Sequence, residues 1–130
     1  MINKLDEFLD KKYIYAIIGV SENKEKYGYK IFKQLLDLNF KIVPINPKLF
    51  ELEGLKCYKS ILDFNDKIDI VNFVVPPSIS LKILDEVVKK NIKKVWFQPG
   101  SWNDDCLKFC KKHKISVIKD FCLLKSSLKI

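Results

Sequence analysis

Short apolar runs, rich in β-branched residues and separated by longer amphipathic stretches, constrain the fold of this chain most strongly. Such runs favour strands, and they occur at residues 13–20, 41–45, 55–58, 69–75, 94–97 and 116–119. Strands that alternate with helices are expected to be parallel and joined by right-handed crossovers. The runs IYAIIGV and IDIVNFVV have the near-continuous apolar character of strands buried on both faces. We therefore expect an α/β fold with helices on both sides of one parallel sheet.

The amphipathic stretches predict helices at residues 28–38, 79–90 and 104–113, with a short helix at 3–10. Ser78 and Asn103 precede two of these stretches. Short polar side chains at such positions accept hydrogen bonds from the first turn of a helix, so we predict both residues as N-caps.

The length of 130 residues predicts one domain, residues 1–130. No apolar run approaches the roughly 18 residues that span a bilayer, so no membrane association is expected. The first stretch, MINKLDEFLDKK, contains acidic residues and lacks the apolar core of a signal peptide. A cytoplasmic location is the expectation.

The net charge of +8 comes entirely from lysine, since the chain contains no arginine. Arginine is the usual bidentate partner of guanine edges and phosphates. The lysines are also spread along the whole chain. We therefore expect surface charge without specific nucleic-acid binding.

The cysteines show no pattern typical of a metal or disulfide site. They are Cys57, Cys106, Cys110 and Cys122, with no CxxC pair and no histidine cluster nearby. Neither a zinc site nor a disulfide framework is expected. No metal-binding residues are predicted.

In open parallel sheets, ligands bind beyond the carboxyl ends of the strands. After the first strand, Gly19 permits a tight turn, Ser21 offers a hydroxyl, and Lys24 and Lys26 offer charge. Gly28 lies where a helix begins, and its N–H groups and dipole suit a pyrophosphate. The pattern G-x-G-x-x-G fails, because Ser and Lys occupy positions 21 and 24. A plain strand-to-helix turn is the alternative.

The second strand ends in Asn46, Pro47 and Lys48. A nicotinamide dinucleotide site would place an acidic residue here for the ribose hydroxyl. The lysine instead permits a ligand with a phosphate on the ribose, such as NADP or coenzyme A.

Two later strand ends carry proline. Pro76 and Pro77 form a stiff apolar ledge against which an adenine ring can pack, with a simple turn before a helix as the alternative. Gln98 precedes a Pro-Gly pair and is expected to make polar contacts with a ligand.

Five segments resemble, in their order and spacing, the small stand-alone CoA-binding domain proteins. They are IIGVSENKEKYGYKIFKQLLDLNFKIVPINP, GLKCYKSILDF, IDIVNFVVPP, KKVWFQPG and ISVIKDFC, and the match covers about residues 6–124. The same fold forms the N-terminal domain of the succinyl-CoA synthetase α subunit. The resemblance implies a three-layer Rossmann-like fold with a parallel sheet of five to six strands, in the order 3-2-1-4-5-6.

It also implies that coenzyme A or an acyl-CoA binds through its ADP and pyrophosphate part at the strand tips. Together with the strand-tip analysis above, the resemblance gives the predicted cofactor-binding residues, which are Gly19, Val20, Ser21, Lys24, Lys26, Tyr27, Gly28, Asn46, Pro47, Lys48, Val75, Pro76, Pro77, Gln98, Pro99, Gly100 and Cys122. The chain departs from the family in two places. The motif Met-Asp-Arg-Cys becomes Lys119 to Cys122, with phenylalanine for arginine, and the loop after Gly19 lacks the usual proline.

No catalytic residue is predicted. The single histidine, His113, lies between two lysines at an expected helix end. We interpret the chain as a non-catalytic CoA-binding protein. Two alternatives stay open: an NADP-binding oxidoreductase or regulator that uses Lys48, and a Rossmann-like interaction module without ligand. An unidentified protein partner and a weak homodimer stay open too. A further hypothesis is that Cys122 forms a mixed disulfide with the CoA thiol.

Overall fold

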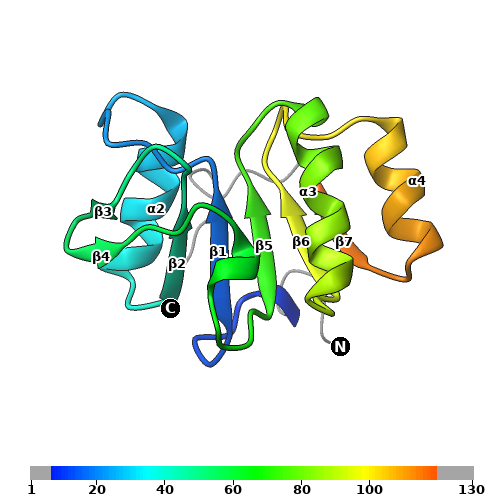
Figure 1. Ribbon diagram of the computed structural model, residues 1–130, viewed down its shortest axis with the longest axis horizontal. Helices are drawn as coiled ribbons and strands as arrows, with labels where there is room; N and C mark the ends of the chain where they lie inside the picture. Colours follow the sequence, from blue (N-terminus) through cyan, green and yellow to red (C-terminus); the bar gives the residue numbers. More distant parts are fainter. Residues whose placement is uncertain (1–6, 120–130) are drawn as a thin grey trace.

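The computed structural model describes residues 7–119 of the chain. Its centre is a sheet of five parallel strands in the order β2-β1-β5-β6-β7 (Figure 1). The strands are β1 (Ile14–Ile18), β2 (Lys41–Ile45), β5 (Ile70–Phe73), β6 (Lys94–Phe97) and β7 (Ser116–Lys119). The expected α/β class and the parallel sheet are confirmed.

Helices cover both faces of the sheet, because successive strand residues point to opposite sides. On one face, Ala16 and Ile18 of β1 lie in a core cluster with residues of α3 (Pro77–Lys89) and α4 (Asp104–Lys112). On the other face, Tyr15 and Ile17 lie in a cluster with α2 (Tyr27–Asp37) and the buried Trp96. The result is the expected three-layer arrangement.

The strand expected at 55–58 is the main correction to the predicted topology. The chain instead forms a hairpin of β3 (Glu51–Leu52) and β4 (Leu55–Lys56), with positive φ angles of 50° at Glu53 and 81° at Gly54. Only Tyr58 reaches the sheet, through one parallel bridge to Ile45. Five strands follow the predicted order, and within residues 7–119 the expected outermost strand is replaced by the β3–β4 hairpin, in which Leu55 and Lys56 pair with β3.

The segment between β2 and β5 also lacks an α-helix. Its one helical element is the three-residue 3₁₀ helix η1 (Ile61–Asp63). The Ser60 hydroxyl caps η1 by accepting a hydrogen bond from the Leu62 N–H. This crossover is joined to the end of β2 by two backbone hydrogen bonds, from the Tyr58 N–H to the Pro44 carbonyl oxygen and from the Asn46 N–H to the Tyr58 carbonyl oxygen.

Element boundaries follow local capping chemistry. Asn103 is confirmed as the N-cap of α4, because its Oδ1 accepts a hydrogen bond from the Cys106 N–H. Ser78 is not an N-cap. The helix α3 begins at Pro77, where the fixed φ of proline suits the first helical position, so Ser78 lies inside the first turn. Residues 3–6 of the expected N-terminal helix lie outside the described residues, and only Glu7 and Phe8 are helical.

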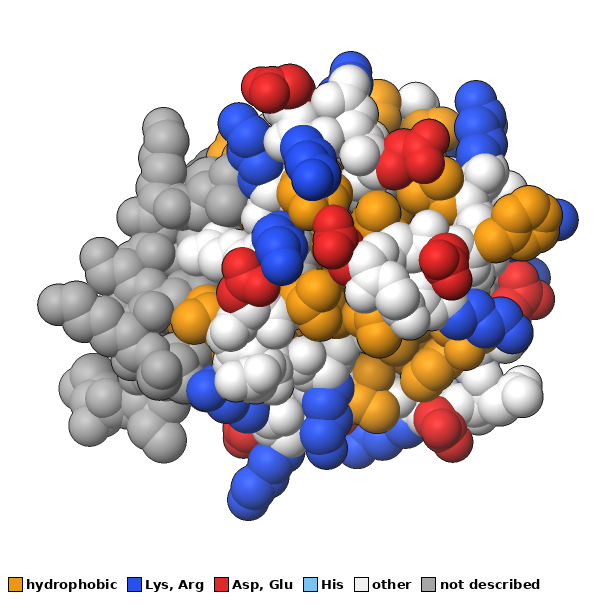
Figure 2. Space-filling model, turned by 90° about the vertical axis from the view of Figure 1, so that its left-hand side faces the viewer, with side chains coloured by type: hydrophobic (Ala, Val, Ile, Leu, Met, Phe, Trp, Pro, Cys, Tyr) orange, Lys and Arg blue, Asp and Glu red, His pale blue; other side chains and the backbone are white. Residues whose placement is uncertain are grey.

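The surface over α2 and the β3–β4 hairpin mixes lysine, acidic and hydrophobic side chains, without a patch of one sign (Figure 2). Within residues 7–119, no helix is long and apolar enough to cross a membrane.

Candidate functional site

Two glycines bring three backbone segments together at the carboxyl edge of the sheet. Gly19 follows β1 with φ of 100°, and a Cβ added there would lie 2.5 Å from the Val74 carbonyl oxygen. A Cβ added to Gly28, in the first turn of α2, would lie 2.0 Å from the Gly19 carbonyl oxygen. The turn after β1 therefore requires glycine at both positions for packing.

The loop between these glycines is tied to the tip of β2. The Asn46 Nδ2 donates to the Val20 carbonyl oxygen at 2.7 Å. The Ser21 hydroxyl accepts from the Asn23 N–H at 3.1 Å. Lys24 and Lys26 are exposed, as are the neighbouring Glu22 and Glu25.

Helix α2 begins at this loop without a side-chain cap and without an acidic residue in its first turn. The positive end of its dipole thus lies at the carboxyl edge of the sheet, uncompensated by a carboxylate of that turn.

A pocket of about 480 Å³, here called the lysine pocket, opens between the tips of β1 and β2 and helix α3. It is lined by Ile18, Gly19, Ile45, Asn46, Pro47, Lys48, Lys59, Val75, Ile79 and Ile83. The Asn46 Oδ1 accepts from the Lys48 N–H at 2.8 Å and fixes the turn that carries this lysine. The lining contains two lysines and no acidic residue, so the pocket favours an anion beside an apolar wall.

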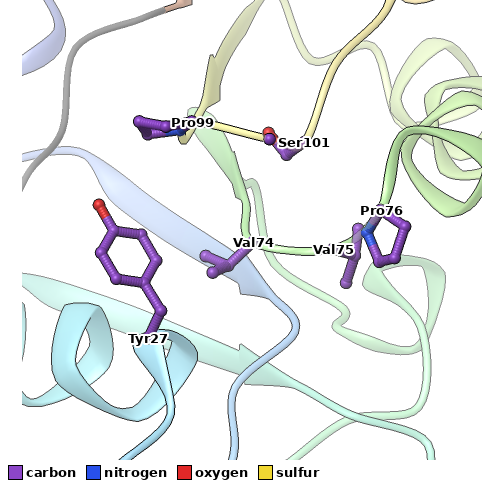
Figure 3. Close-up of a pocket in the computed structure, with 7 residues that line it drawn as sticks. Tyr27, Val74, Val75, Pro76, Pro99 and Ser101 are labelled. Atoms are coloured by element: carbon purple, nitrogen blue, oxygen red, sulfur yellow. The ribbon is translucent and has the colours of Figure 1, made fainter.

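A second pocket of about 500 Å³, here called the neutral pocket, lies beyond the ends of β5 and β6. It is lined by Tyr27, Val74, Val75, Pro76, Pro99, Gly100 and Ser101, and none of these carries a charge at neutral pH (Figure 3). Val75 lines both pockets. The two pockets therefore flank one side chain of the segment after β5.

A rigid turn shapes one wall of the neutral pocket. The Ser101 N–H and hydroxyl donate to the Gln98 carbonyl oxygen at 3.1 and 2.7 Å. Gly100 has φ of 86°, as the third residue of a type II turn requires, and Pro99 precedes it. Gln98 is held at the end of β6 by its N–H bond to the Phe73 carbonyl oxygen.

Beneath this turn, three side chains form a hydrogen-bonded chain. The Tyr27 hydroxyl donates to the Gln98 Oε1 at 3.2 Å, and the Gln98 Nε2 donates to the Asn72 Oδ1 at 3.1 Å. Gln98 and Asn72 are fully buried. The predicted polar residue Gln98 thus bonds protein groups at both amide atoms. The sequence reasoning missed Asn72, although a lone amide inside an apolar strand was a usable signal.

The other predicted site residues divide between the pockets and the segments around them. The lysine pocket contains Gly19, Asn46, Pro47, Lys48 and Val75; the neutral pocket contains Tyr27, Val75, Pro76, Pro99 and Gly100. Val20 and Gly28 are buried, Pro77 begins α3, and Ser21, Lys24 and Lys26 belong to neither lining. Cys122 lies outside the described residues. The lining residues that were not predicted are Ile18, Ile45, Lys59, Val74, Ile79, Ile83 and Ser101. Lys59 reaches the site through the crossover, and Ile79 and Ile83 reach it through helix α3, whereas the other four lie at or just beyond strand ends.

The described thiols are protected from reaction by burial. Cys57, Cys106 and Cys110 are buried and free, and burial raises the pKa of each, that of Cys110 to about 12. His113 is the C-cap of α4, with its ring centroid 4.4 Å from that of Phe109, and lines neither pocket. Among residues 7–119, no group of three or more His, Cys, Asp or Glu residues is placed to hold a metal ion.

Comparison with known families finds one model that matches residues 14–127, the CoA binding domain. An ADP-forming acetate–CoA ligase of Methanocaldococcus jannaschii is 53% identical over 78 residues, which are 60% of this chain and 11% of that protein. The uncharacterized protein YneT of Bacillus subtilis is 25% identical over 120 residues, which are 92% of this chain and 89% of YneT. The chain thus spans a small part of the ligase and most of YneT.

Among solved structures, a conserved hypothetical protein from Pyrococcus furiosus superposes with a TM-score of 0.82 at 38% identity. The superposition covers 86% of this chain and 97% of the Pyrococcus furiosus chain. The described fold is therefore that of a whole small protein as well as that of a domain in larger ones.

Proposed function

The chain belongs to the CoA binding domain family, and from this premise we propose that it binds coenzyme A or an acyl-CoA without catalysing a reaction. The nucleotide part of the ligand, with its pyrophosphate, occupies the carboxyl edge of the sheet. The observation that carries the proposal is the pair of pockets that share Val75 at this edge. Each pocket has a volume within the range of roughly 300–1,000 Å³ that is usual for small-molecule sites.

The charges around the lysine pocket support its assignment to the nucleotide and phosphates. Lys48 and Lys59 line it, and Lys24 and Lys26 lie on the loop that leads into α2. Coenzyme A carries a pyrophosphate and a ribose phosphate, and lysine binds such groups as a point charge. The uncapped start of α2 adds a positive dipole at the same edge.

The chemistry of the two linings supports a binding role without catalysis. Neither lining contains a histidine, cysteine, aspartate or glutamate. Histidine and carboxylate side chains are the commonest general acids and bases in enzymes, and the reactive groups that line the pockets are limited to Tyr27, Lys48, Lys59 and Ser101. The acetate–CoA ligase activity of the relative is not carried over, because this chain matches 11% of that protein.

Isothermal titration calorimetry with CoA, acetyl-CoA, NAD and NADP tests the proposal. We expect micromolar binding of CoA or acetyl-CoA and far weaker binding of the two dinucleotides. Lys48→Ala should weaken CoA binding by roughly three- to tenfold. Lys82→Ala removes an exposed lysine of α3 that lines neither pocket, and it should leave the affinity unchanged.

Three results would contradict parts of the proposal. Selective NADP binding would favour an oxidoreductase or regulator. No binding of any of the four ligands would favour an interaction module. Release of free thiol from acetyl-CoA faster than in buffer would contradict the non-catalytic role.

A further inference from the structure

The two lysines of the lysine pocket come from chain segments that are hydrogen-bonded to each other. Tyr58 forms two backbone hydrogen bonds of 2.9 Å with the end of β2, one with Pro44 and one with Asn46. Lys59 directly follows Tyr58, and Lys48 belongs to the turn that Asn46 fixes. The backbone therefore holds both lysines at one pocket, although the β3–β4 hairpin separates them in sequence.

Neither Lys48 nor Lys59 is neutralised by a protein carboxylate within residues 7–119. The salt bridges in this part of the chain join other lysines to aspartates, and the pocket lining contains no acidic residue. Two like charges held at one cavity repel each other in the absence of an anion. The pocket therefore favours a group that carries close to two negative charges over one that carries a single charge.

The wall that α3 contributes to the lysine pocket is apolar. Ile79 and Ile83 are four residues apart on α3 and both line the pocket, so their side chains lie on the same face of the helix. Ile79 is 41% exposed, which is unusual for a large apolar side chain, and a flat ring that packs on it would remove this surface from water. One cavity thus combines a surface for a base with two cations for a phosphate.

We propose that Lys48 and Lys59 together bind the phosphate monoester on the adenosine ribose of the ligand, while the base packs against Ile79 and Ile83. In coenzyme A this group is the 3′-phosphate, so the protein selects CoA against dephospho-CoA, which lacks it. The inference rests on the proposed function and deepens it, because it assigns one phosphate of CoA to the two lysines and makes Lys59 a specificity-determining residue.

Ligand chemistry favours the monoester over the pyrophosphate as the partner of the lysines. A phosphate monoester carries roughly −1.5 to −2 charges at pH 7 and offers three acceptor oxygens. Each phosphate of the pyrophosphate is bonded on both sides and carries one negative charge. The two groups leave the ribose at different carbons, so the pyrophosphate can lie at the turn after Gly19 and the start of α2 while the monoester lies at the lysines.

Calorimetry with CoA and dephospho-CoA tests the assignment by removing the phosphate, the lysines or both. The wild-type protein should bind CoA about thirtyfold more tightly than dephospho-CoA. In Lys48→Ala with Lys59→Ala this ratio should fall to about two, because CoA loses affinity and dephospho-CoA changes by at most about twofold. Retained binding of dephospho-CoA also shows that the variant is folded.

Two controls separate direct contact from general charge and from the neutral pocket. Lys41→Ala with Lys82→Ala removes the same charge from exposed lysines that line neither pocket, and the ratio should stay at about thirty. The nucleotide fragment of CoA, 3′-phosphoadenosine 5′-diphosphate, lacks the pantetheine arm. Its affinity relative to ADP should show the same dependence on Lys48 and Lys59.

The outcomes distinguish this inference from the proposed function. Equal losses for CoA and dephospho-CoA in the pocket variant would mean that the lysines bind the pyrophosphate, which overturns the inference while CoA binding stands. A wild-type ratio near one, or an equal fall of the ratio in the control variant, would overturn it too. If the wild-type protein binds neither CoA nor dephospho-CoA, the proposed function fails and this inference with it.

Discussion

The lysine pocket and the neutral pocket share Val75, yet different kinds of interaction shape them. The lysine pocket is shaped mainly by exposed charge, because Lys48 and Lys59 in its lining are both exposed. The neutral pocket is shaped mainly by buried hydrogen bonds, because both the main chain and the side chain of Gln98 are hydrogen-bonded there. We therefore expect the lysine pocket to attract an anionic ligand at long range and the neutral pocket to recognise uncharged groups of the same ligand.

The difference teaches how each part should respond to change. Surface charges are screened by salt, and each contributes modestly. Buried polar networks are sensitive to single-atom changes but not to ionic strength. Four experiments test this contrast, ordered by the size of their effects.

The largest effect is expected where both pockets depend on one backbone contact. Gly28→Ala places a Cβ about 2.0 Å from the Gly19 carbonyl oxygen, so the start of α2 must move. We expect a loss of about 3 kcal/mol in the free energy of unfolding, measured by urea denaturation. Gly54→Ala is the control: it meets no atom within 4 Å, and its φ of 81° should cost only about 1–2 kcal/mol. Equal losses would contradict the close contact.

The next effect concerns charge. The double substitution Lys48→Ala with Lys59→Ala should weaken CoA binding by about thirtyfold at low ionic strength, because two phosphate partners are lost. The loss should shrink when salt is raised to about 0.5 M, since salt screens the wild-type attraction as well. Adding Tyr27→Phe should change the affinity by the same factor in both backgrounds. A non-additive result would show that the two pockets are coupled.

A smaller effect is expected from the turn that shapes the neutral pocket. Ser101→Ala removes the hydroxyl bond to the Gln98 carbonyl oxygen at 2.7 Å, at a cost of about 1 kcal/mol in unfolding free energy. CoA binding should weaken about twofold, with the affinity for the nucleotide fragment unchanged. Ser116→Ala, which changes an exposed serine of β7 that lines neither pocket, serves as the control for loss of a hydroxyl. A drop in nucleotide affinity with Ser101→Ala would mean that the two parts are not separable.

The smallest effect concerns thiol chemistry. Folding raises the thiol pKa of Cys110 to about 12, so this thiol stays protonated at pH 8 and reacts slowly. Because the unfolded thiol ionises first, its contribution favours unfolding as the pH rises from about 9 toward 12. Thiol titration at pH 8 should show Cys57, Cys106 and Cys110 reacting only after denaturation. Fast reaction of these three would contradict their burial.

The mixed disulfide of Cys122 stays a prediction. Intact-mass analysis after incubation with CoA disulfide should show one adduct that is lost in Cys122→Ser.

Much of the fold follows from the sequence. The apolar runs correctly predicted the five sheet strands, and Asn103 correctly predicted the start of α4. The prediction of an outer sheet strand at residues 55–58 was wrong, because Leu55 and Lys56 pair with β3 in a hairpin. The turn of this hairpin gives Glu53 a positive φ, which is unusual for glutamate and which no local sequence pattern predicts. The prediction of Ser78 as an N-cap was wrong, because α3 begins one residue earlier, at Pro77, whose fixed φ suits the first helical position.

Only part of the candidate site could be predicted from the sequence. Residues just after strands, such as Asn46 and Lys48, follow from the rule that ligands bind at strand tips. Lys59 and Ile79 reach the lysine pocket only through the tertiary path of the crossover and α3. Gln98 was predicted as a ligand contact from its place before Pro99, but its partner Asn72 lies on a different strand and depends on register.

The crossover without an α-helix divides the chain into two parts with separate local structure. Residues 14–45 form one strand–helix–strand unit and residues 70–119 form the next two crossovers, while the β1–β5 pairing joins them. We expect each unit to form early in folding and the seam between β1 and β5 to close last, since it joins segments far apart in sequence. Proteolytic nicking should begin in residues 46–69. A ligand that contacts both Gly19 and Ile79 would act as a clamp across this seam and slow its opening.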